Sequence, residues 1–318
     1  MATAIAHPNI ALVKYWGKRD RKLNLPATSS LSLTLAPFET RTSVEADADS
    51  DECWINGELI SGRAAERVFV HLDRMDPWRK PATVVSTTNF PVGAGLASSA
   101  SGFAALTLAG AAAFEQVRDD TALSILARQG SGSACRSLWG GWVEWPKGER
   151  PDGLDSHGKP LADKDHWDVA MVVAVLSRDA KSVSSTEGMN RTMETSPFYD
   201  GWVESNEQDL APAKAAVLAK DLEALGQIME RSALRMHASM LAANPPVRYW
   251  KSNSVWAMDA VENLRRQGIG AWWTMDAGPN VKILCETKDA KAVAKRLANV
   301  AESTEILMPG GPARLIED

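Results

Sequence analysis

The segment NFPVGAGLASSASGFAALTLAGAAA, residues 89–113, constrains the fold most, because a loop rich in glycine and serine runs directly into an alanine-rich helix. The glycines allow successive backbone N–H groups to point at an anion, and the helix N-terminus adds its positive dipole end. Ser98, Ser99 and Ser101 supply hydroxyl groups for phosphate or Mg²⁺. A serine cap after turn glycines would explain part of this pattern, but three clustered serines favour a phosphate loop. A Walker-type loop would end in a lysine, and this segment contains none.

Composition excludes several classes of protein. The chain has 318 residues, of which 45% are hydrophobic and 24% are charged, as in a globular protein of one or two domains. A formal net charge of −5 argues against a nucleic-acid binder. No apolar run has the length of a membrane span, and the N-terminus lacks the features of a signal peptide. We therefore expect a cytoplasmic protein with no nucleic-acid or membrane partner.

Cysteine and histidine are too few and too scattered to suggest metal or disulfide chemistry. The three cysteines, Cys53, Cys135 and Cys285, form no CxxC pair, and the five histidines form no HExxH motif. Neither a disulfide framework nor a transition-metal site is therefore expected.

Hydrophobic patterning predicts a mixture of strands and helices. Segments rich in β-branched residues predict strands from Thr42, Ala82 and Asp168, and WINGELIS, residues 54–61, predicts a hairpin around Asn-Gly. Strands precede helices in both halves without a regular βαβ order, so the predicted class is α+β. The predicted helices span residues 64–75, 99–114, 121–129, 205–219, 222–241, 254–267 and 292–300.

The polar stretch at residues 145–168 is rich in glycine and proline and predicts a long surface loop. The strand that follows and the polar residues beyond it suggest a domain boundary near residue 180. We therefore expect two domains, residues 1–180 and 181–318.

A basic stretch, ALVKYWGKRDRKLNLP at residues 11–26, stands out in an acidic chain. Lys14 and Lys18 flank Tyr15, Trp16 and a glycine, and further cations follow. A solvated basic face is the usual explanation of a charge run. The interleaved aromatic residues, and the sequence PATSSLSLTL that follows, favour a pocket for a small polyanion instead.

A second turn of small residues lies in ARQGSGSACRSLWGGWVEW, residues 127–145. Its GSGS sequence begins at Gly130 and is followed by Arg136, whose planar guanidinium matches a carboxylate or a phosphate. GSGS alone would be typical of a flexible loop. The tryptophan-rich segment 139–145 is expected to fix this turn against a core.

A carboxylate stands between an apolar strand and a Gly-Pro turn in WWTMDAGPNVKIL, residues 272–284. An aspartate in such a place often serves only the turn, by accepting backbone N–H bonds. Beside two phosphate-binding loops and a basic pocket, Asp276 becomes the leading candidate for a general base.

These stretches together resemble the mevalonate diphosphate decarboxylase family of the GHMP kinase superfamily. The matching motifs are NIALVKYWGKRD, NLPATSSLSLTL, NFPVGAGLASSASGFAAL, ARQGSGSACRSLWGGWVEW and MDAGPN, in the family's order between residues 5 and 285. The shorter VSSTEGM and ETSPFY also fit. The resemblance implies a two-lobed GHMP kinase-like fold with a deep active-site cleft between the lobes. Residues 1–180 would form a GHMP-type ATP-binding domain and residues 181–318 a GHMP-type C-terminal domain, usually in a homodimer.

The implied reaction is the ATP-dependent decarboxylation of (R)-mevalonate 5-diphosphate to isopentenyl diphosphate, ADP, phosphate and CO₂. The resemblance assigns Asp276 to orient the C3 hydroxyl and accept its proton, and Lys14 to stabilise charge beside it. Arg136 would grip the substrate carboxylate, and Ser131 and Ser133 would share this task through neutral hydrogen bonds. Mg²⁺ is expected with ATP, held largely by phosphate oxygens and by Ser99.

The resemblance also assigns the binding residues. The substrate-binding residues are expected to be Tyr15, Trp16, Gly17, Lys18, Arg67, Ser131, Gly132, Ser133, Ala134, Cys135, Arg136, Ser185 and Thr186. The ATP-binding residues are expected to be Asn89, Pro91, Gly93, Ala94, Gly95, Leu96, Ala97, Ser98, Ser99 and Ser101.

Alternatives stay open within the superfamily and outside it. A mevalonate 5-phosphate decarboxylase or a kinase that phosphorylates C3 and stops would carry similar motifs. The presence of both Asp276 and Lys14 favours a decarboxylase over a kinase of that type. A non-catalytic paralogue that binds nucleotides or isoprenoid precursors is a different class, and the intact site residues argue against it.

Overall fold

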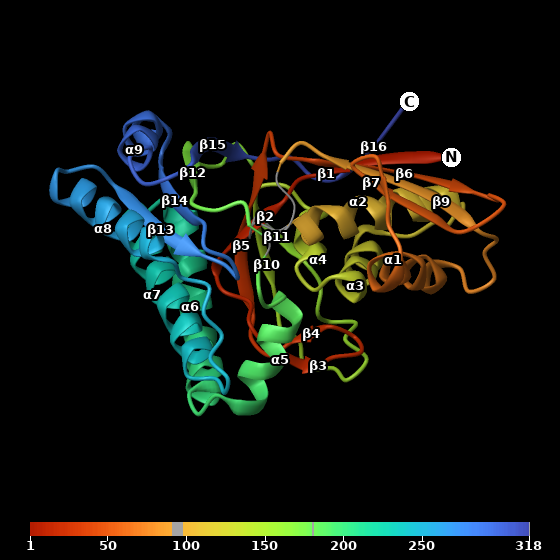
Figure 1. Ribbon diagram of the computed structural model, residues 1–318, viewed down its shortest axis with the longest axis horizontal. Helices are drawn as coiled ribbons and strands as arrows, with labels where there is room; N and C mark the ends of the chain where they lie inside the picture. The colour runs from red at the N-terminus through yellow and green to blue at the C-terminus, as the bar shows by residue number, and fades with distance from the viewer. Residues whose placement is uncertain (91–97, 180, 318) are drawn as a thin grey trace.

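The computed structural model describes residues 1–90, 98–179 and 181–317. This part of the chain forms an elongated molecule, with β6, β9 and helices α1–α3 towards one end and helices α6–α9 at the other (Figure 1). Both chain ends lie on the side of β1 and β16 (Figure 1). The described helices are α1 Gly62–Met75, α2 Ser98–Ala113, α3 Asp120–Gly130, α4 Ala134–Ser137, α5 Ser185–Thr195, α6 Tyr199–Ala219, α7 Leu222–Leu241, α8 Ser252–Arg266 and α9 Ala290–Leu297.

The described strands form a six-stranded sheet in the order β16-β1-β6-β9-β7-β8 and an eight-stranded sheet in the order β11-β10-β5-β15-β12-β14-β13, with β2 paired to β5. The small pair β3-β4 lies apart from both. The strands are β1 Ala2–Ala6, β2 Asn9–Val13, β3 Lys18–Asp20, β4 Leu25–Pro26, β5 Ser30–Ala36, β6 Thr40–Ala46, β7 Glu52–Ile55, β8 Glu58–Leu59, β9 Ala82–Thr88, β10 Trp142–Trp145, β11 Lys159–Ala162, β12 Val169–Val175, β13 Ala271–Met275, β14 Val281–Glu286, β15 Ser303–Pro309 and β16 Arg314–Ile316.

Helix α2 is apolar because most of its residues are buried. It packs on β1 and β6 of the six-stranded sheet and against α3 and α4. Its small residues allow this close approach: a side chain at Gly110 would come within 2.9 Å of the Met75 sulfur on α1. The helix that follows the predicted phosphate loop is therefore fixed rigidly in the core.

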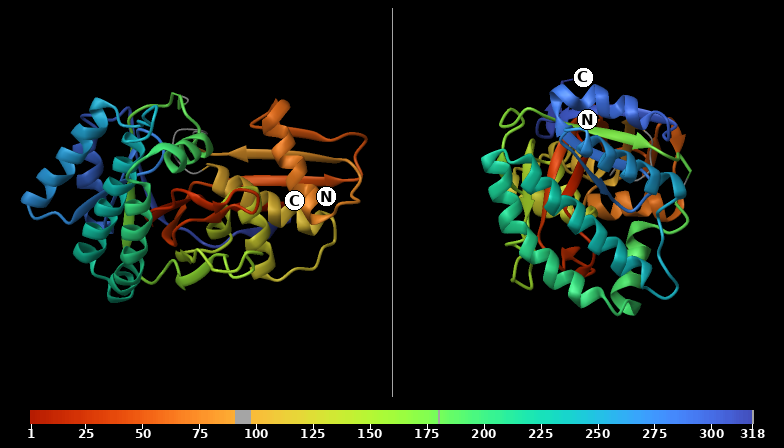
Figure 2. Two further views of the ribbon diagram at one scale, coloured as in Figure 1. Left: turned by 90° about the horizontal axis from the view of Figure 1, so that it is seen from below. Right: turned by 90° about the vertical axis from the view of Figure 1, so that its left-hand side faces the viewer.

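Strand β12 is buried along its whole length because helices cover both faces of its sheet. Met171 and Val173 point into a core that α6 and α7 complete, whereas Val172 and Ala174 point into a second core with α8 and α9. The left view of Figure 2 shows helices α6–α8 gathered at the end of the molecule opposite to α1. This double burial explains the continuous apolar sequence from residue 169.

Most of the predicted elements are confirmed. The predicted strands coincide with β6, β9 and β12, and the hairpin is β7-β8 with Asn56 and Gly57 at φ values of 51° and 83°. The prediction for residues 222–241 coincides with α7. Helix α6 begins earlier than predicted, at Tyr199, because buried Trp202 anchors an additional turn.

The prediction of a surface loop over residues 145–168 is wrong in part. Strand β11 lies within this segment and pairs with β10. Trp145 and Ser156 are both fully buried, and the indole N–H of Trp145 donates to the Ser156 hydroxyl at 3.0 Å. Glycine and proline composition alone does not reveal this tertiary anchoring.

Helix α5 and several strands are missing from the predictions. Helix α5 buries only a narrow stripe, Gly188, Met189 and Thr192, so its periodic signal is weak. Among the residues that the structure describes, no helix combines the length and the apolar character that a membrane crossing requires.

Candidate active site

Lys14, Asp276 and Lys282 form a buried charged cluster. Asp276 follows β13, Lys14 follows β2, and Lys282 lies on β14. The Lys14 ammonium nitrogen lies 2.6 Å from Oδ1 of Asp276, and that of Lys282 lies 3.3 Å from Oδ2. The two lysine side chains are 1% and 0% exposed, but 26% of the Asp276 side chain remains accessible. The carboxylate is therefore held from within the protein and open on one side.

The electrostatics of this cluster favour the ionised carboxylate. Burial acts to raise the pKa of Asp276, but the charges and hydrogen bonds of Lys14 and Lys282 outweigh it, so this pKa lies well below its usual value. Burial lowers the pKa of Lys14 to about 8, although Asp276 opposes the shift. Near neutral pH the cluster carries a carboxylate and an ammonium in contact.

The backbone at Lys14 is fixed by two polar residues that the sequence did not reveal. Ser232 of α7 accepts from the Lys14 backbone N–H at 3.0 Å, and Asn206 of α6 donates to its carbonyl at 2.9 Å. Ser232 also donates to Asn206 at 2.8 Å. The ammonium itself donates to the carbonyl of Ala11 at 2.8 Å. In the sequence, the sign of this network is a polar residue at a position where the helix pattern is otherwise apolar.

Arg136, on the short helix α4, is held in one orientation. Its Nε donates to the Asn9 side chain at 2.9 Å, and its Nη1 donates to the Ser30 hydroxyl at 2.8 Å. The guanidinium also lies over the Trp145 ring, 5.5 Å from its centroid. Arg136 is only 2% exposed, and burial lowers its pKa. Such a rigid buried cation is suited to orienting a carboxylate.

Tyr15 and Gly132 meet beside Arg136. The Tyr15 hydroxyl has no hydrogen-bond partner among the described residues, and burial raises the pKa of the phenol. A Cβ atom at Gly132 would lie 2.6 Å from this hydroxyl. The Tyr15 ring packs on Trp145 at 4.7 Å between centroids. The structure thus brings together the basic stretch and the GSGS turn.

Trp16 and Gly17 place backbone atoms rather than presenting side chains. The indole N–H of Trp16 donates to Thr192 at 3.1 Å, and its carbonyl accepts from Trp202 at 2.9 Å. Gly17 has a φ of 106°, and a Cβ there would overlap the Tyr199 hydroxyl. Trp16 is 2% exposed and belongs to a hydrophobic cluster, so its ring serves packing.

Lys18, which follows Gly17, lies near Arg67 of α1. The Lys18 ammonium donates to Asn24 at 2.6 Å, and burial lowers its pKa to about 8, with contributions from Arg67 and Arg21. Arg67 donates to the carbonyl of Gly130 at 3.3 Å. Two cations therefore gather near the start of the GSGS turn, as a polyanion site requires.

The GSGS turn reaches the first turn of α2. The Ser131 hydroxyl donates to the Ser99 hydroxyl at 3.3 Å, which joins the predicted carboxylate-binding and ATP-binding segments. The carbonyl of Ser133 accepts from Asn9 at 3.1 Å. Ala134 and Cys135 are fully buried, and burial raises the pKa of the Cys135 thiol to about 12.

The predicted ATP loop falls partly outside the described residues. Ser98 and Ser99 open helix α2, and Ser99 is exposed. Ser101 is buried, and its hydroxyl lies 2.7 Å from that of Thr40. The Asn89 side chain donates to the carbonyl of Pro37 at 2.8 Å. Outside the described residues lie Pro91, Gly93, Ala94, Gly95, Leu96 and Ala97.

The start of α5 lies beside Asp276. Lys181 donates to the carbonyl of Ala277 at 2.8 Å and to the Ser185 hydroxyl at 3.1 Å. Thr186, in the same turn, is exposed. Lys181 is a further cation near the carboxylate that the sequence analysis missed.

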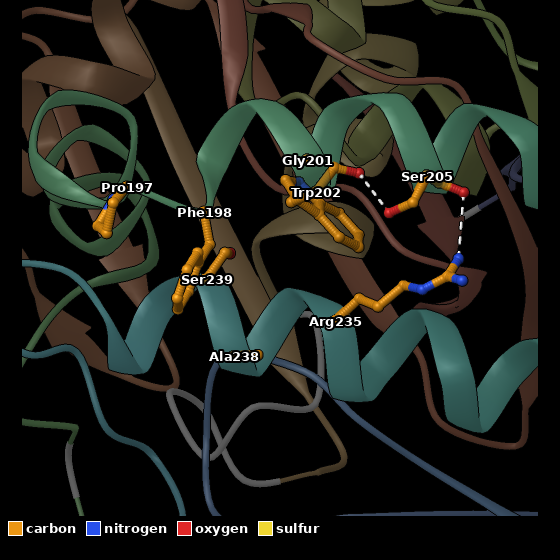
Figure 3. Close-up of a pocket in the computed structure, with 8 residues that line it drawn as sticks. All are labelled: Pro197, Phe198, Gly201, Trp202, Ser205, Arg235, Ala238 and Ser239. Atoms are coloured by element: carbon orange, nitrogen blue, oxygen red, sulfur yellow. Dashed lines mark hydrogen bonds between the residues drawn. The ribbon is translucent and has the colours of Figure 1, made fainter.

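A separate pocket of about 280 Å³ lies between α6 and α7 (Figure 3). Phe198 and Trp202 line one side of it and Ala238 and Ser239 the other, while Arg235 donates to the carbonyl of Ser205 (Figure 3). Its lining contains none of the predicted site residues. Trp202 nevertheless connects this pocket to the segment that carries Lys14 to Lys18.

Comparisons with known proteins show the family to which this chain is similar. Residues 6–158 match the family model of the diphosphomevalonate decarboxylase-like N-terminal domain, and residues 171–308 match that of the mevalonate 5-diphosphate decarboxylase C-terminal domain. The diphosphomevalonate decarboxylase of Candida albicans is 40% identical over 301 residues, which cover 89% of this chain and 83% of the relative.

Solved structures also match over nearly the whole chain. Mevalonate diphosphate decarboxylase from Staphylococcus aureus has a TM-score of 0.93 and 39% identity, with coverage of 99% of this chain and 98% of that one. The complex of MDDEF with MVAPP, AMPPCP and magnesium has a TM-score of 0.92 and 40% identity, with coverage of 100% and 99%. The predicted α+β, GHMP kinase-like class is thereby confirmed. The chain belongs to the diphosphomevalonate decarboxylase family.

Proposed function

We propose that this chain catalyses the ATP-dependent decarboxylation of (R)-mevalonate 5-diphosphate, which yields isopentenyl diphosphate, ADP, phosphate and CO₂. The observation that carries the proposal is the buried contact of Lys14 with Asp276 at 2.6 Å, which interacts electrostatically with the fixed guanidinium of Arg136. A related structure, MDDEF, was solved with MVAPP, AMPPCP and magnesium, and this supports the same ligands here.

Asp276 is proposed to orient the C3 hydroxyl and to accept its proton. A carboxylate with a strongly lowered pKa is a weak base, and it would not remove a proton from a free tertiary alcohol. Phosphoryl transfer passes through a loose transition state, so the hydroxyl needs no early deprotonation. As its oxygen bonds to phosphorus, the hydroxyl proton becomes strongly acidic, and a weak base beside it is then sufficient.

Lys14 is proposed to stabilise the charge that develops during this transfer. Its ammonium already donates to Asp276 and to the carbonyl of Ala11. An ammonium has three donors, so one remains for an oxygen of the transferred phosphoryl group. The buried setting strengthens that interaction relative to water.

Decarboxylation then follows from loss of the tertiary phosphate. The C3–O bond breaks with its electron pair on phosphate, and the C1–C2 bond breaks to release CO₂ and form the C2=C3 double bond. Arg136 and Ser131 are proposed to orient the carboxylate. Because a tight ion pair would oppose the release of CO₂, the anchoring of Arg136 by Asn9 and Ser30 serves to limit its approach.

The remaining binding roles follow the positions of the side chains. Tyr15, Lys18 and Arg67 are proposed to bind the diphosphate, with the GSGS turn between them and Arg136. The first turn of α2 is proposed to bind ATP through its N-terminus. The exposed hydroxyl of Ser99 offers an oxygen ligand of the kind that Mg²⁺ prefers, and Mg²⁺ would supply neutralisation of the nucleotide phosphates.

The assembly and the division of the chain are also part of this proposal. We place a domain boundary near residue 180, beyond the end of β12, so that residues 1–180 bind ATP. We propose a cytoplasmic homodimer, supported by three buried free cysteines and by apolar side chains such as Phe198 and Trp256 that are 61% and 67% exposed. Light scattering of the purified protein at several concentrations tests the dimer.

The activity is tested by supplying ATP, Mg²⁺ and either mevalonate 5-diphosphate or mevalonate 5-phosphate and measuring CO₂ and ADP. We expect equal amounts of CO₂ and ADP from the diphosphate and a much lower kcat/KM for the monophosphate. Equal or faster turnover of the monophosphate would assign the alternative substrate. ADP without CO₂ would indicate a kinase that stops at C3 phosphorylation.

A further inference from the structure

Lys282 is a charged residue on β14, a strand whose other buried residues are apolar. It lies on β14 between Val281 and Ile283, and all three side chains are completely buried. Burying an ammonium costs considerable free energy unless the charge is paired. Its ion pair with Asp276, at 3.3 Å from Oδ2, supplies that pairing at the centre of the candidate site.

Lys14 and Lys282 hold different oxygens of one carboxylate. Lys14 contacts Oδ1 from the end of β2, and Lys282 contacts Oδ2 from β14. A single cation would leave the carboxylate free to rotate about its last side-chain bond, because that rotation is soft. Ion pairs at both oxygens restrict this rotation, and the accessible part of Asp276 is left for a substrate.

The ammonium of Lys14 also contacts a group other than Asp276. Lys14 has a second acceptor, the carbonyl of Ala11, and lies where the proposed reaction places the transferred phosphoryl group. An ammonium that turns towards a phosphoryl oxygen weakens its contact with Asp276. A second cation on the same carboxylate compensates for that change.

We propose that Lys282 is a positioning residue, whose ammonium keeps Asp276 ionised and oriented while Lys14 engages the transferred phosphoryl group. The inference rests on the proposed function and deepens it. Lys282 itself touches Asp276 and acts on the substrate only through that carboxylate.

Other groups around Asp276 do not replace Lys282 in this role. Lys181 donates to the carbonyl of Ala277 and to Ser185. His237 of α7 is buried close to the cluster, and burial, with a contribution from Lys14, lowers its pKa to about 3, so the imidazole is neutral. Arg136 is engaged by Asn9 and Ser30.

The test is the pH dependence of kcat for Lys282→Met and Lys282→Arg at saturating substrates. Without Lys282 the pKa of Asp276 rises. Because Asp276 is active in its ionised form, the variant should lose activity at a higher pH than the unaltered protein when the solution is acidified. We expect the acid limb of Lys282→Met to move up by about 1 to 3 pH units, the range produced by one nearby opposite charge. Lys282→Arg should keep the limb of the unaltered protein.

Matched controls separate this role from a structural one. Lys288→Met removes an exposed lysine just beyond the same strand and should leave the profile unchanged, because its partner is Glu286. Combining Lys282→Met with Asp276→Asn should give no loss of kcat beyond that of Asp276→Asn alone, since Lys282 acts through Asp276. Melting temperature and nucleotide binding verify that each variant is folded.

The outcomes are distinguishable. A uniform loss of kcat in Lys282→Met at every pH, with an unmoved acid limb, would overturn the inference and leave the proposed reaction intact. A Lys282→Met variant with unchanged kcat and pH profile would also overturn it. Absence of CO₂ release by the unaltered, folded protein would instead refute the proposed function.

Discussion

The ammonium of Lys14 and the carboxylate of Asp276 lie 2.6 Å apart, although the two residues are 262 positions apart along the chain. Helix α7 accounts for this proximity, because the strand before Lys14, β2, and the strand before Asp276, β13, both pack on it. Ser232 of the same helix accepts from the Lys14 backbone. Packing on one helix therefore positions both Lys14 and Asp276. Their contact results from this packing as well as from the attraction between opposite charges.

Replacing Asp276 with asparagine tests its proposed role as the proton acceptor. Asparagine keeps the size of the side chain but neither accepts the C3 hydroxyl proton nor balances the two lysines. We expect kcat to fall by about 10²- to 10⁴-fold, with binding of mevalonate 5-diphosphate largely retained. Single-turnover CO₂ release and calorimetric binding measure the two quantities separately. Near-normal turnover would remove Asp276 from the mechanism.

The lowered pKa of Lys14 predicts the alkaline limit of activity. Its ammonium loses its proton as the pH rises through about 8, because burial disfavours the charge. We expect kcat/KM, which reports the free enzyme, to decline above that pH. Lys18, which is proposed to bind the diphosphate, also has a pKa lowered to about 8. Lys14→Arg keeps its charge, so only one of these two ionisations is removed and the alkaline limb of the remaining activity should become less steep. An identical alkaline limb in this variant would assign that limb to another group.

Replacing Arg136 with lysine tests whether geometry or charge matters for the carboxylate. Lysine keeps the positive charge but loses the fork that binds Asn9 and Ser30 at once. We expect kcat/KM to fall by about 10²-fold, because a small displacement of an orienting group has an effect of that size. Arg19→Lys, an exposed arginine that donates to backbone carbonyls, is the control and should change little. Comparable kinetics for both variants would contradict the assignment.

Local chemistry made much of this fold predictable. The continuous apolar run of β12, the Asn-Gly hairpin and the boundaries of α7 follow from patterns a few residues long. Strand β11 and helix α5 were missed because their stability depends on distant partners, such as the Tyr249 hydroxyl, which donates to the carbonyl of Val183 just before α5. Short-range patterns carry no information about such contacts.

The candidate site, like the fold, could be predicted from the sequence only in part. The motifs around Lys14, Arg136 and Asp276 were visible in the sequence, and the structure brings these residues together. Lys282 was not identified, because one lysine in an apolar strand gives no sign of the carboxylate that it meets. Ser232 was missed for a similar reason, since its partner is the backbone N–H of Lys14, which is far away along the chain.

Replacing Gly17 with alanine tests whether the substrate-binding segment depends on backbone geometry. Gly17 has a φ of 106°, which an alanine adopts only with strain, and the new Cβ would overlap the Tyr199 hydroxyl. We expect a loss of about 1 to 3 kcal/mol in the free energy of unfolding and a raised KM for mevalonate 5-diphosphate. Denaturant unfolding and initial rates measure both effects. Adding Tyr199→Phe removes part of the overlap but none of the strain in φ, so it should restore stability only in part. Full recovery in the double variant would show that the overlap with Tyr199, and not the backbone conformation, is what requires glycine at this position.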